Sequence, residues 1–307
     1  MKSSTKWLLV IVGIILFIGI GMTFLFFAFL TSLTRGEDVE TYTESGHGDK
    51  IAVIELRDVI ISSEDIVRQF KKYREDRSIR AILFHVDSPG GGVVASHEIY
   101  QEVKRTRAEG KPVVVSMGAL AASGGYYVSC PASKIVANPG TLTGSIGVIS
   151  QFVRIDSLLH KIGIDAITIK SGKLKDAGTP FRQMTPEDRE YFQNLMDDVH
   201  RQFIAIVEKE RKLPHDSVLA YADGRVFTGE QALQRHLVDT LGTFEDAVRI
   251  TAKLVGIKEQ PTIVRERKRV FSLLDRIFGE SVVSGVSGLM NEILHQPLLQ
   301  YNMMHGF

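Results

Sequence analysis

Short apolar runs alternate with longer amphipathic segments along most of the chain. Runs at 51–56, 79–86 and 113–115 have the length and the apolar content of buried strands. Residues 62–77 carry a polar face, and residues 93–109 place apolar side chains on one helical stripe. This alternation of strands and helices predicts an α/β fold, in which helices cover a mostly parallel sheet.

The second half of the chain continues the alternation. Further strands are expected at 134–137 and at 164–170, the latter with the sequence IDAITIK. Thr185-Pro-Glu-Asp has the pattern of a helix start, and the apolar stripe that follows it extends to Lys212. A turn at 223–229 leads into another capped helix, and Thr243 begins the next one.

The N-terminal segment is apolar on every side. Residues 7–30 contain no charged side chain, a length that spans the hydrocarbon layer as a helix. The run exceeds the apolar core of a cleaved signal peptide, which favours an uncleaved anchor. Lys2 and Lys6 precede it and acidic residues follow it, so the N-terminus is expected in the cytoplasm. Residues 1–34 are therefore interpreted as cytoplasmic N-terminus and anchor, and residues 35–49 as a polar linker.

The remaining chain divides by composition near Pro261. Residues 50–260 contain the predicted α/β domain. Residues 261–307 begin with a basic stretch and continue as an amphipathic C-terminal tail. Such a tail could lie on a membrane surface, pack in an oligomer or enter a substrate groove.

Overall composition excludes several classes of function. The 307 residues are 44% hydrophobic and carry a net charge of +1, which describes a globular protein and gives no indication of nucleic-acid binding. Cys130 is the one cysteine, so no internal disulfide can form, and its apolar neighbours predict a buried packing residue. No group of Cys and His has the spacing of a metal site.

Ser123 occupies the most distinctive turn in the sequence. It follows a strand and two alanines and precedes two glycines, and a short helix is expected from Ser123 to Pro131. A hydroxyl at a helix N-terminus lies beside unpaired N–H groups that favour negative charge, which suits a nucleophile. The alternative is that Ser123 is only a helix cap and that the glycines only permit close packing.

A second glycine turn, Gly90 to Gly92, ends the strand at 79–86. Parallel strands bring their carboxyl ends to one edge of the sheet, so the two turns can face each other. The N–H groups of Gly91 and Gly124 could then hold an oxyanion. The turn lacks the pattern of a phosphate loop, although it could also be an ordinary loop.

A serine nucleophile requires a base to accept its proton. His85 lies in an apolar strand and is interpreted as a core residue, while His97 and His160 lie on predicted helices. Lys173 and Lys175 lie in an irregular loop. A lysine base must be largely neutral near pH 7, which requires burial to lower its pKa well below about 10.4, whereas most lysines are solvated.

Five motifs together resemble the signal peptide peptidase A family, the membrane-anchored Ser-Lys proteases of bacteria. The chain is similar to the short, single-unit form of this family from about residue 51 to 256. The motifs occur in the family's order and are DSPGGG (87–92), SMGALAASGGYYVS (116–129), TLTGSIGV (141–148), SGKLKD (171–176) and ADGRVFTGEQA (222–232).

The resemblance implies a role for each site residue. Ser123 matches the nucleophile and Lys175 matches the general base. Ser145 matches the serine that orients this lysine. Gly91 and Gly124 match the two donors of the oxyanion hole.

The resemblance also implies a crotonase-like or ClpP-like α/β fold and a homo-oligomer. In the family's short form, the nucleophile and the lysine of one site can come from neighbouring protomers. Lys173 would be a surface neighbour of the base, and no metal or organic cofactor would be required.

The expected protein is a single-pass serine endopeptidase of the cytoplasmic membrane, with its catalytic domain on the outer side. Its expected substrates are hydrophobic peptides, such as remnant signal peptides after their release from preproteins. Two alternatives remain at this point. One is an acyl-CoA enzyme of the crotonase fold, and the other is a non-catalytic membrane scaffold.

Overall fold

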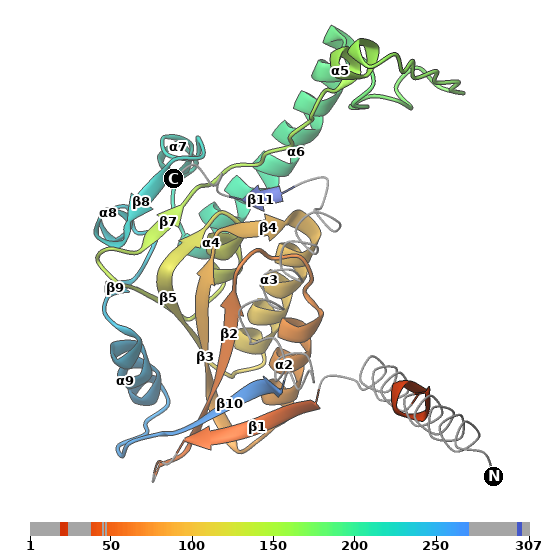
Figure 1. Cartoon of the computed structure of the whole chain (residues 1–307). Coiled ribbons are helices and arrows are strands. Elements are labelled where there is room, and N and C mark those ends of the chain that lie inside the picture. The colour runs from red at the N-terminus through yellow and green to blue at the C-terminus, as the bar shows by residue number, and fades with distance from the viewer. Residues whose placement is uncertain (1–18, 24–37, 45, 47, 270–299, 303–307) are drawn as a thin grey trace, which may run out of the picture. The chain divides into compact units, whose positions relative to one another are not determined.

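A computed structural model of the chain describes residues 19–23, 38–44, 46, 48–269 and 300–302 (Figure 1). The chain divides into two compact units, and the larger one contains residues 43–265 and 295–307. The larger unit therefore holds every residue that the sequence assigns to the site.

Most of the expected anchor at 7–30 lies outside the described residues, as does part of the expected linker at 35–49. Residues 19–23 are helical, and strand β1 spans Asp38–Glu44. Within the described ranges, no helix combines the length and the apolar character that a membrane crossing needs.

A parallel sheet forms the centre of the larger unit. Its strands, in spatial order, are β10 (Thr262–Arg269), β2 (Lys50–Arg57), β3 (Ile79–Ser88), β5 (Val113–Ala122), β6 (Lys134–Ala137) and β9 (Thr240–Leu241). Val53 pairs with Leu83, and Leu83 pairs with Val114, so β2, β3 and β5 run in register through the apolar core. The predicted α/β fold with a parallel sheet is confirmed.

Helices pack on both faces of this sheet (Figure 1). The described helices of the larger unit are α2 (Glu64–Glu75), α3 (Val93–Ala108), α4 (Gly124–Ser129), α5 (Asp156–Lys161), α6 (Pro186–Arg211), α7 (His215–Leu219), α8 (Gly229–Gln234) and α9 (Phe244–Leu254), of which α5 lies away from the sheet. Successive strand residues point to opposite faces. Ile54 accordingly packs in one core with Phe70 of α2 and Ile99 of α3, while Val53 packs in a second core with Ala247 of α9.

Four shorter strands lie at the edge where the candidate residues gather. They are β4 (Gly90–Gly92), β7 (Leu142–Gly144), β8 (Val226–Thr228) and β11 (Gln300–Asn302). Strand β7 extends the far end of β5 in parallel and pairs with β8 in antiparallel fashion. Strand β11 pairs antiparallel with the glycine strand β4.

Three helices begin with a threonine capping box. The caps are Thr185 for α6, Thr228 for α8 and Thr243 for α9, and each threonine side chain accepts a hydrogen bond from the backbone N–H three residues later. The helix starts predicted at Thr185 and Thr243 are therefore confirmed. Helix α6 ends at Arg211, one residue before the expected limit.

The strand expected at 164–170 is wrong. These residues adopt no regular structure, and all of them are exposed. Their apolar positions resemble a half-buried strand, but Ile167 and Ile169 are 88% and 96% exposed. Apolar side chains in such a pattern are usually buried, but no described part of this chain covers them.

Strand β10 lies beyond the domain boundary proposed near residue 260. Residues 262–265 pair with Lys50 to Val53 of β2, because their apolar members Ile263 and Val264 find partners on the two faces of the sheet. Within the expected tail at 261–307, residues 270–299 and 303–307 lie outside the described residues.

Candidate active site

Ser123 lies between the end of β5 and the start of α4. Its backbone has φ +54° and ψ −115°, a conformation that is costly for a residue with a side chain. Two hydrogen bonds of 2.8 Å hold it, from Ser123 N–H to the Gly144 carbonyl and from Tyr127 N–H to the Ser123 carbonyl. The hydroxyl is buried and, among the described residues, has no hydrogen-bond partner. A strained turn between a strand and a short helix, with a buried and unpaired hydroxyl, agrees with the turn that a serine nucleophile occupies in other hydrolases.

The glycines after Ser123 allow α4 to approach the glycine turn after β3. A Cβ atom at Gly124 would lie 2.7 Å from Ser96 Oγ and 3.1 Å from the Gly91 nitrogen. A Cβ atom at Gly125 would lie 2.7 Å from the Ser88 carbonyl oxygen. Such contacts are too close for any side chain, so only glycine permits this approach. The two predicted oxyanion donors, Gly91 and Gly124, are therefore neighbours in the structure.

Residues before α2 and at the end of β3 hold the Gly90–Gly92 strand in place. Ile60 N–H donates to the Gly90 carbonyl at 2.8 Å, and Gly92 N–H donates to the Ile60 carbonyl at 2.7 Å. Gly91 has φ +156°, and a Cβ atom there would lie 2.3 Å from the Ile60 oxygen. Ser88 Oγ accepts a 3.1 Å hydrogen bond from Gly90 N–H. The backbone around Gly91 is thus fixed by main-chain contacts with Ile60 and by the Ser88 side chain.

Ser145 lies beside Ser123 because their two strands are paired. Ala122 of β5 pairs with Gly144 of β7, and each is followed by one of the two serines. Ser145 is buried, has φ +50° and donates its backbone N–H to the Arg225 carbonyl at 2.9 Å. The structure therefore brings Ser123, Ser145 and the two glycine turns to one edge of the sheet. The meeting of the two turns is predicted from the parallel strands, and the place of Ser145 agrees with the family resemblance.

Lys175 is the one predicted site residue that lies apart. Its side chain is exposed, and in the described part of the chain it makes no hydrogen bond or ion pair. Its backbone N–H donates to the Gly172 carbonyl at 3.1 Å, in a loop between α5 and α6. Figure 1 shows α5 at the end of α6 that is remote from β5 and α4. Within one chain, then, the buried Ser123 hydroxyl makes no hydrogen bond to Lys175.

The three histidines considered as bases contact groups other than the Ser123 hydroxyl. His85 packs against the Phe244 ring, and partial burial lowers the pKa of its imidazole. His97 Nδ1 is 2.8 Å from the Tyr127 hydroxyl, and His160 pairs with an aspartate on an exposed segment. The interpretation of His85 as a packed histidine agrees with its place in β3.

Other candidate chemistry is limited. Cys130 is fully buried, and burial raises the pKa of its thiol to about 12, which makes it a packing residue rather than a nucleophile. Among the residues that the structure describes, no group of three or more His, Cys, Asp or Glu side chains could hold a metal ion.

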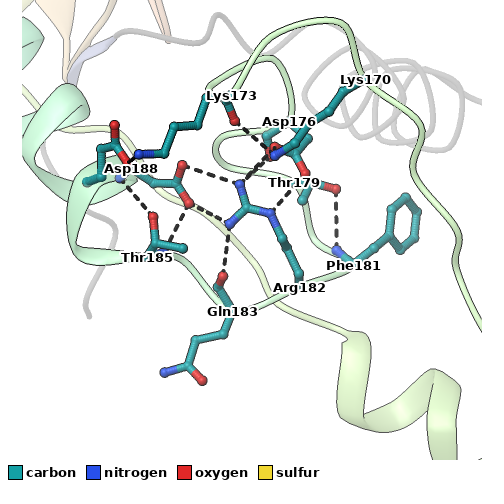
Figure 2. A network of polar contacts seen from close by, with 10 residues as sticks. Lys170, Lys173, Asp176, Thr179, Phe181, Arg182, Gln183, Thr185 and Asp188 are labelled. Carbon is teal, nitrogen blue, oxygen red and sulfur yellow. Dashed lines mark hydrogen bonds and ion pairs between the residues drawn. The ribbon is translucent and has the colours of Figure 1, made fainter.

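A polar network beside Lys175 has no counterpart in the sequence analysis. Figure 2 shows Arg182 between the carboxylates of Asp176 and Asp188, with Lys170 on the far side of Asp176. Asp188 belongs to the helix-start motif at Thr185, which the sequence does reveal. Arg182 has no distinguishing neighbours in sequence, and only the folded loop shows its contacts.

Comparisons with known proteins match these observations. A sequence profile of peptidase family S49 matches residues 105–258, and a profile of the Clp proteases matches residues 50–141. The second match agrees with the predicted ClpP-like α/β fold.

Individual relatives are similar over most of the larger unit. A putative protease of Synechocystis is 44% identical over 209 residues, which are 68% of this chain and 75% of that protein. A putative signal peptide peptidase SppA of Enterococcus faecium is 34% identical over 222 residues, which are 68% of this chain and 64% of that protein. Among solved structures, a ClpP1 mutant of Listeria monocytogenes aligns with a TM-score of 0.44 at 15% identity, covering 64% of this chain and 93% of that chain.

Proposed function

Since the chain belongs to peptidase family S49 and is a protease of the signal peptide peptidase A type, we propose that it cleaves peptides with a Ser-Lys dyad. Ser123 is the nucleophile and Lys175 the general base. The observation that carries this proposal is the Ser123 turn, with its positive φ, its buried unpaired hydroxyl and its place at the start of α4. A hydroxyl without a partner in the core costs stability, and an incoming lysine amine would provide the partner.

The reaction proceeds through an acyl-enzyme. Ser123 Oγ bonds to the scissile carbonyl carbon while its proton passes to Lys175 Nζ. The N–H groups of Gly91 and Gly124 bind the resulting oxyanion, and Ser145 orients the lysine. The C–N bond then breaks as Nζ returns the proton to the leaving amine. Water attacks the acyl carbon, Lys175 accepts its proton, and the proton returns to Ser123 Oγ as the ester breaks.

The dyad forms between protomers of a homo-oligomer. Two features support this assignment: Lys175 is exposed in the isolated chain, and the adjacent segment carries the exposed side chains of Ile164, Ile167 and Ile169. An apolar segment of this kind gains free energy when a second copy covers it. A neighbouring protomer would then supply Lys175 to Ser123, and burial in that interface would favour the neutral amine.

Substrates bind as extended peptides along β4. Strand β11 supports this mode, because residues 300–302 of the chain itself pair antiparallel with Gly90–Gly92. The backbone of β4 therefore has the geometry to receive an added strand, and such pairing places a peptide carbonyl beside Gly91. Hydrophobic peptides, remnant signal peptides above all, are the proposed substrates, and no cofactor is required.

Residues 7–30 anchor the protease in the cytoplasmic membrane as a single span. The support is the uncharged sequence of this segment and the balance of charges around it. The catalytic domain then acts on the outer side, where signal peptides become available after preproteins are processed.

The test is hydrolysis of a detergent-solubilised synthetic signal peptide by the full chain. Ser123→Ala and Lys175→Ala should each lose activity by about a thousandfold or more, with assembly unchanged in sedimentation. Lys173→Ala is the matched control, since the Lys173 side chain is exposed and pairs with Glu187 rather than with Ser123. Activity that survives Ser123→Ala removes the nucleophile assignment. An inactive wild type leaves a membrane scaffold or an acyl-CoA enzyme as the function.

A further inference from the structure

Arg182 is the centre of the polar network in the loop that carries Lys175 (Figure 2). Its Nε and Nη2 atoms donate to Asp176 Oδ2 and Oδ1, each at 2.9 Å. Its Nη1 atom donates to Asp188 Oδ2 and, at 3.0 Å, to the Gln183 carbonyl. One guanidinium thus binds two carboxylates, and its contact with Asp176 is bidentate.

Asp188 attaches this network to the start of helix α6. Its carboxylate accepts a 3.0 Å hydrogen bond from Thr185 N–H, and its own N–H donates to Thr185 Oγ1 at 3.1 Å. These bonds form the capping box of α6, and the Asp188 side chain is 2% exposed. Arg182 therefore connects a buried position at the start of a long helix to Asp176, the residue directly after Lys175.

The network also balances charge. The hydrogen bonds from Arg182 hold the pKa values of the Asp176 and Asp188 carboxyls well below their usual range, so both are ionised. Lys170 Nζ donates to Asp176 Oδ1 and to the Lys173 carbonyl, so two cations compensate the two carboxylates. A carboxylate next to a lysine favours the charged amine, and compensation of that carboxylate favours the neutral amine that a base requires.

We infer that Arg182 is a positioning residue for Lys175, because it fixes the loop backbone at Asp176 and neutralises the adjacent carboxylate. This role rests on the proposed function, in which Lys175 is the general base. The other charged groups of the loop and of the α6 start are Lys173 and Glu187, which pair with each other, Asp165, which pairs with His160, and Arg189 and Glu190 of the first α6 turns. Arg182 does not touch the reacting atoms, so its removal should change the base and leave peptide binding intact.

The experiment compares the peptidase kinetics of wild type, Arg182→Met and Arg182→Lys over a range of pH. In Arg182→Met we expect kcat to fall by about tenfold or more at neutral pH, since small displacements of a reacting group are costly. KM should change by less than about twofold, because uniform substrate binding is kept. The pH of half-maximal kcat should rise by about half a unit or more, since loss of the Arg182 charge leaves Lys170 to balance two carboxylates, and the excess negative charge favours the protonated amine. Arg182→Lys keeps one positive charge at this position. Its kcat and its pH of half-maximal kcat should therefore lie between those of wild type and Arg182→Met.

Two further variants distinguish an effect of charge on Lys175 from a general loss of protein stability. Asp176→Asn in the Arg182→Met background removes one of the two carboxylates and so the excess negative charge, and the pH of half-maximal kcat should return toward the wild-type value. Arg211→Met is the matched control, because Arg211 forms a bidentate pair with Asp239 at the other end of α6. It should lower the thermal stability without moving the pH profile.

Each remaining outcome decides the inference. A wild-type kcat and pH profile in Arg182→Met, or a loss that follows thermal stability as in Arg211→Met, overturns the positioning role. Lys175→Ala in the same assay separates this failure from failure of the proposed function. If Lys175→Ala is inactive, only the role of Arg182 falls. If it keeps activity, the base assignment and the role of Arg182 fall together.

Discussion

The nucleophile region and the lysine region of the proposed dyad are held in opposite ways. Ser123 is 1% exposed, and backbone hydrogen bonds from β7 and α4 fix it on both sides. Residues 161–173, which lead to Lys175, are exposed throughout. The core of the chain itself packs around the nucleophile region, whereas the lysine region has exposed apolar side chains.

This difference explains what each region can do alone. A strained turn such as that of Ser123 persists only where surrounding structure over-determines it, and the packed end of β5 supplies that structure. The lysine loop is less deeply packed. Gly178 lies against the half-buried Phe152 and Phe192 rings, and polar contacts around Arg182 and the capping box of α6 hold the segment beside them. In the proposed mechanism, one chain prepares the nucleophile and assembly supplies the base, so proteolysis depends on the oligomer.

The largest expected effect comes from mixing two inactive variants. Chains with Ser123→Ala and chains with Lys175→Ala each lack one half of the dyad. If the halves come from different protomers, random co-assembly should restore about one quarter of the wild-type activity, because one site in four receives both intact groups. The measurement is peptide hydrolysis after co-expression of the two chains with different affinity tags.

The co-purified mixture provides its own control. Both tags must appear in one assembly, and each variant alone must stay inactive. Mixed assemblies without activity would show that serine and lysine belong to the same chain, and the loop would then have to move toward Ser123 within one protomer.

A second large effect is expected from charges on the exposed segment. Replacement of Ile167 and Ile169 by aspartate should dissociate the oligomer and lower activity by about a hundredfold or more, since the lysine is no longer delivered. Thermal stability of the single chain should be unchanged, because both side chains are almost fully exposed. Sedimentation and peptide hydrolysis measure the two effects together.

Leu254→Asp is the matched control for this pair. Leu254 is also an exposed apolar residue, but it lies on α9, which packs on the sheet face that contains Val53, and not in the loop of residues 164–170. It should leave both assembly and activity at the wild-type level. An assembled and active Ile167→Asp, Ile169→Asp protein would exclude this segment from the interface.

Local patterns predicted the nucleophile region well. The strand at 134–137 coincides with β6, and the short helix after Ser123 ends before Pro131, as expected. Both depend on neighbours in sequence, namely β-branched residues, glycines and a proline. The meeting of the two glycine turns also followed from sequence, because parallel strands place their carboxyl ends at one edge.

The lysine region was harder to predict for physical reasons. The apolar residues at 164–170 indicate a segment that favours burial, but a pattern does not reveal which surface buries it. Arg182 has the appearance of an ordinary loop arginine, because its ion pairs depend on the fold of the loop. Strand β11 has three residues and pairs with glycines, so no periodicity announces it.

A moderate effect is expected when the strand that pairs with β4 is removed. A chain that ends at residue 299 lacks β11, so the backbone of Gly90–Gly92 becomes free for substrate. If β11 occupies β4 part of the time, the apparent affinity for substrate falls in proportion to the fraction of open sites. Removal of β11 should therefore raise kcat/KM by about three- to tenfold. The measurement is hydrolysis of a short peptide by both forms.

A synthetic peptide with the sequence of residues 298–307 tests the same contact in trans. It should inhibit the shortened chain and have less effect on the full chain. Equal kcat/KM values for both forms, together with no inhibition by the peptide, would show that β11 does not compete with substrate.

The smallest expected effect measures the strain at Ser123 itself. Ser123→Gly and Ser123→Ala both remove the hydroxyl, but only glycine adopts φ +54°, ψ −115° without steric cost. The glycine variant should therefore be more stable than the alanine variant by about 1 kcal/mol, or about 2–4 °C in Tm. At Ser129, inside α4, the order should reverse, because glycine destabilises a helix relative to alanine. Equal stabilities at Ser123 would mean that the turn stores no strain, and the contrast between a preformed nucleophile and a delivered base would then depend on burial alone.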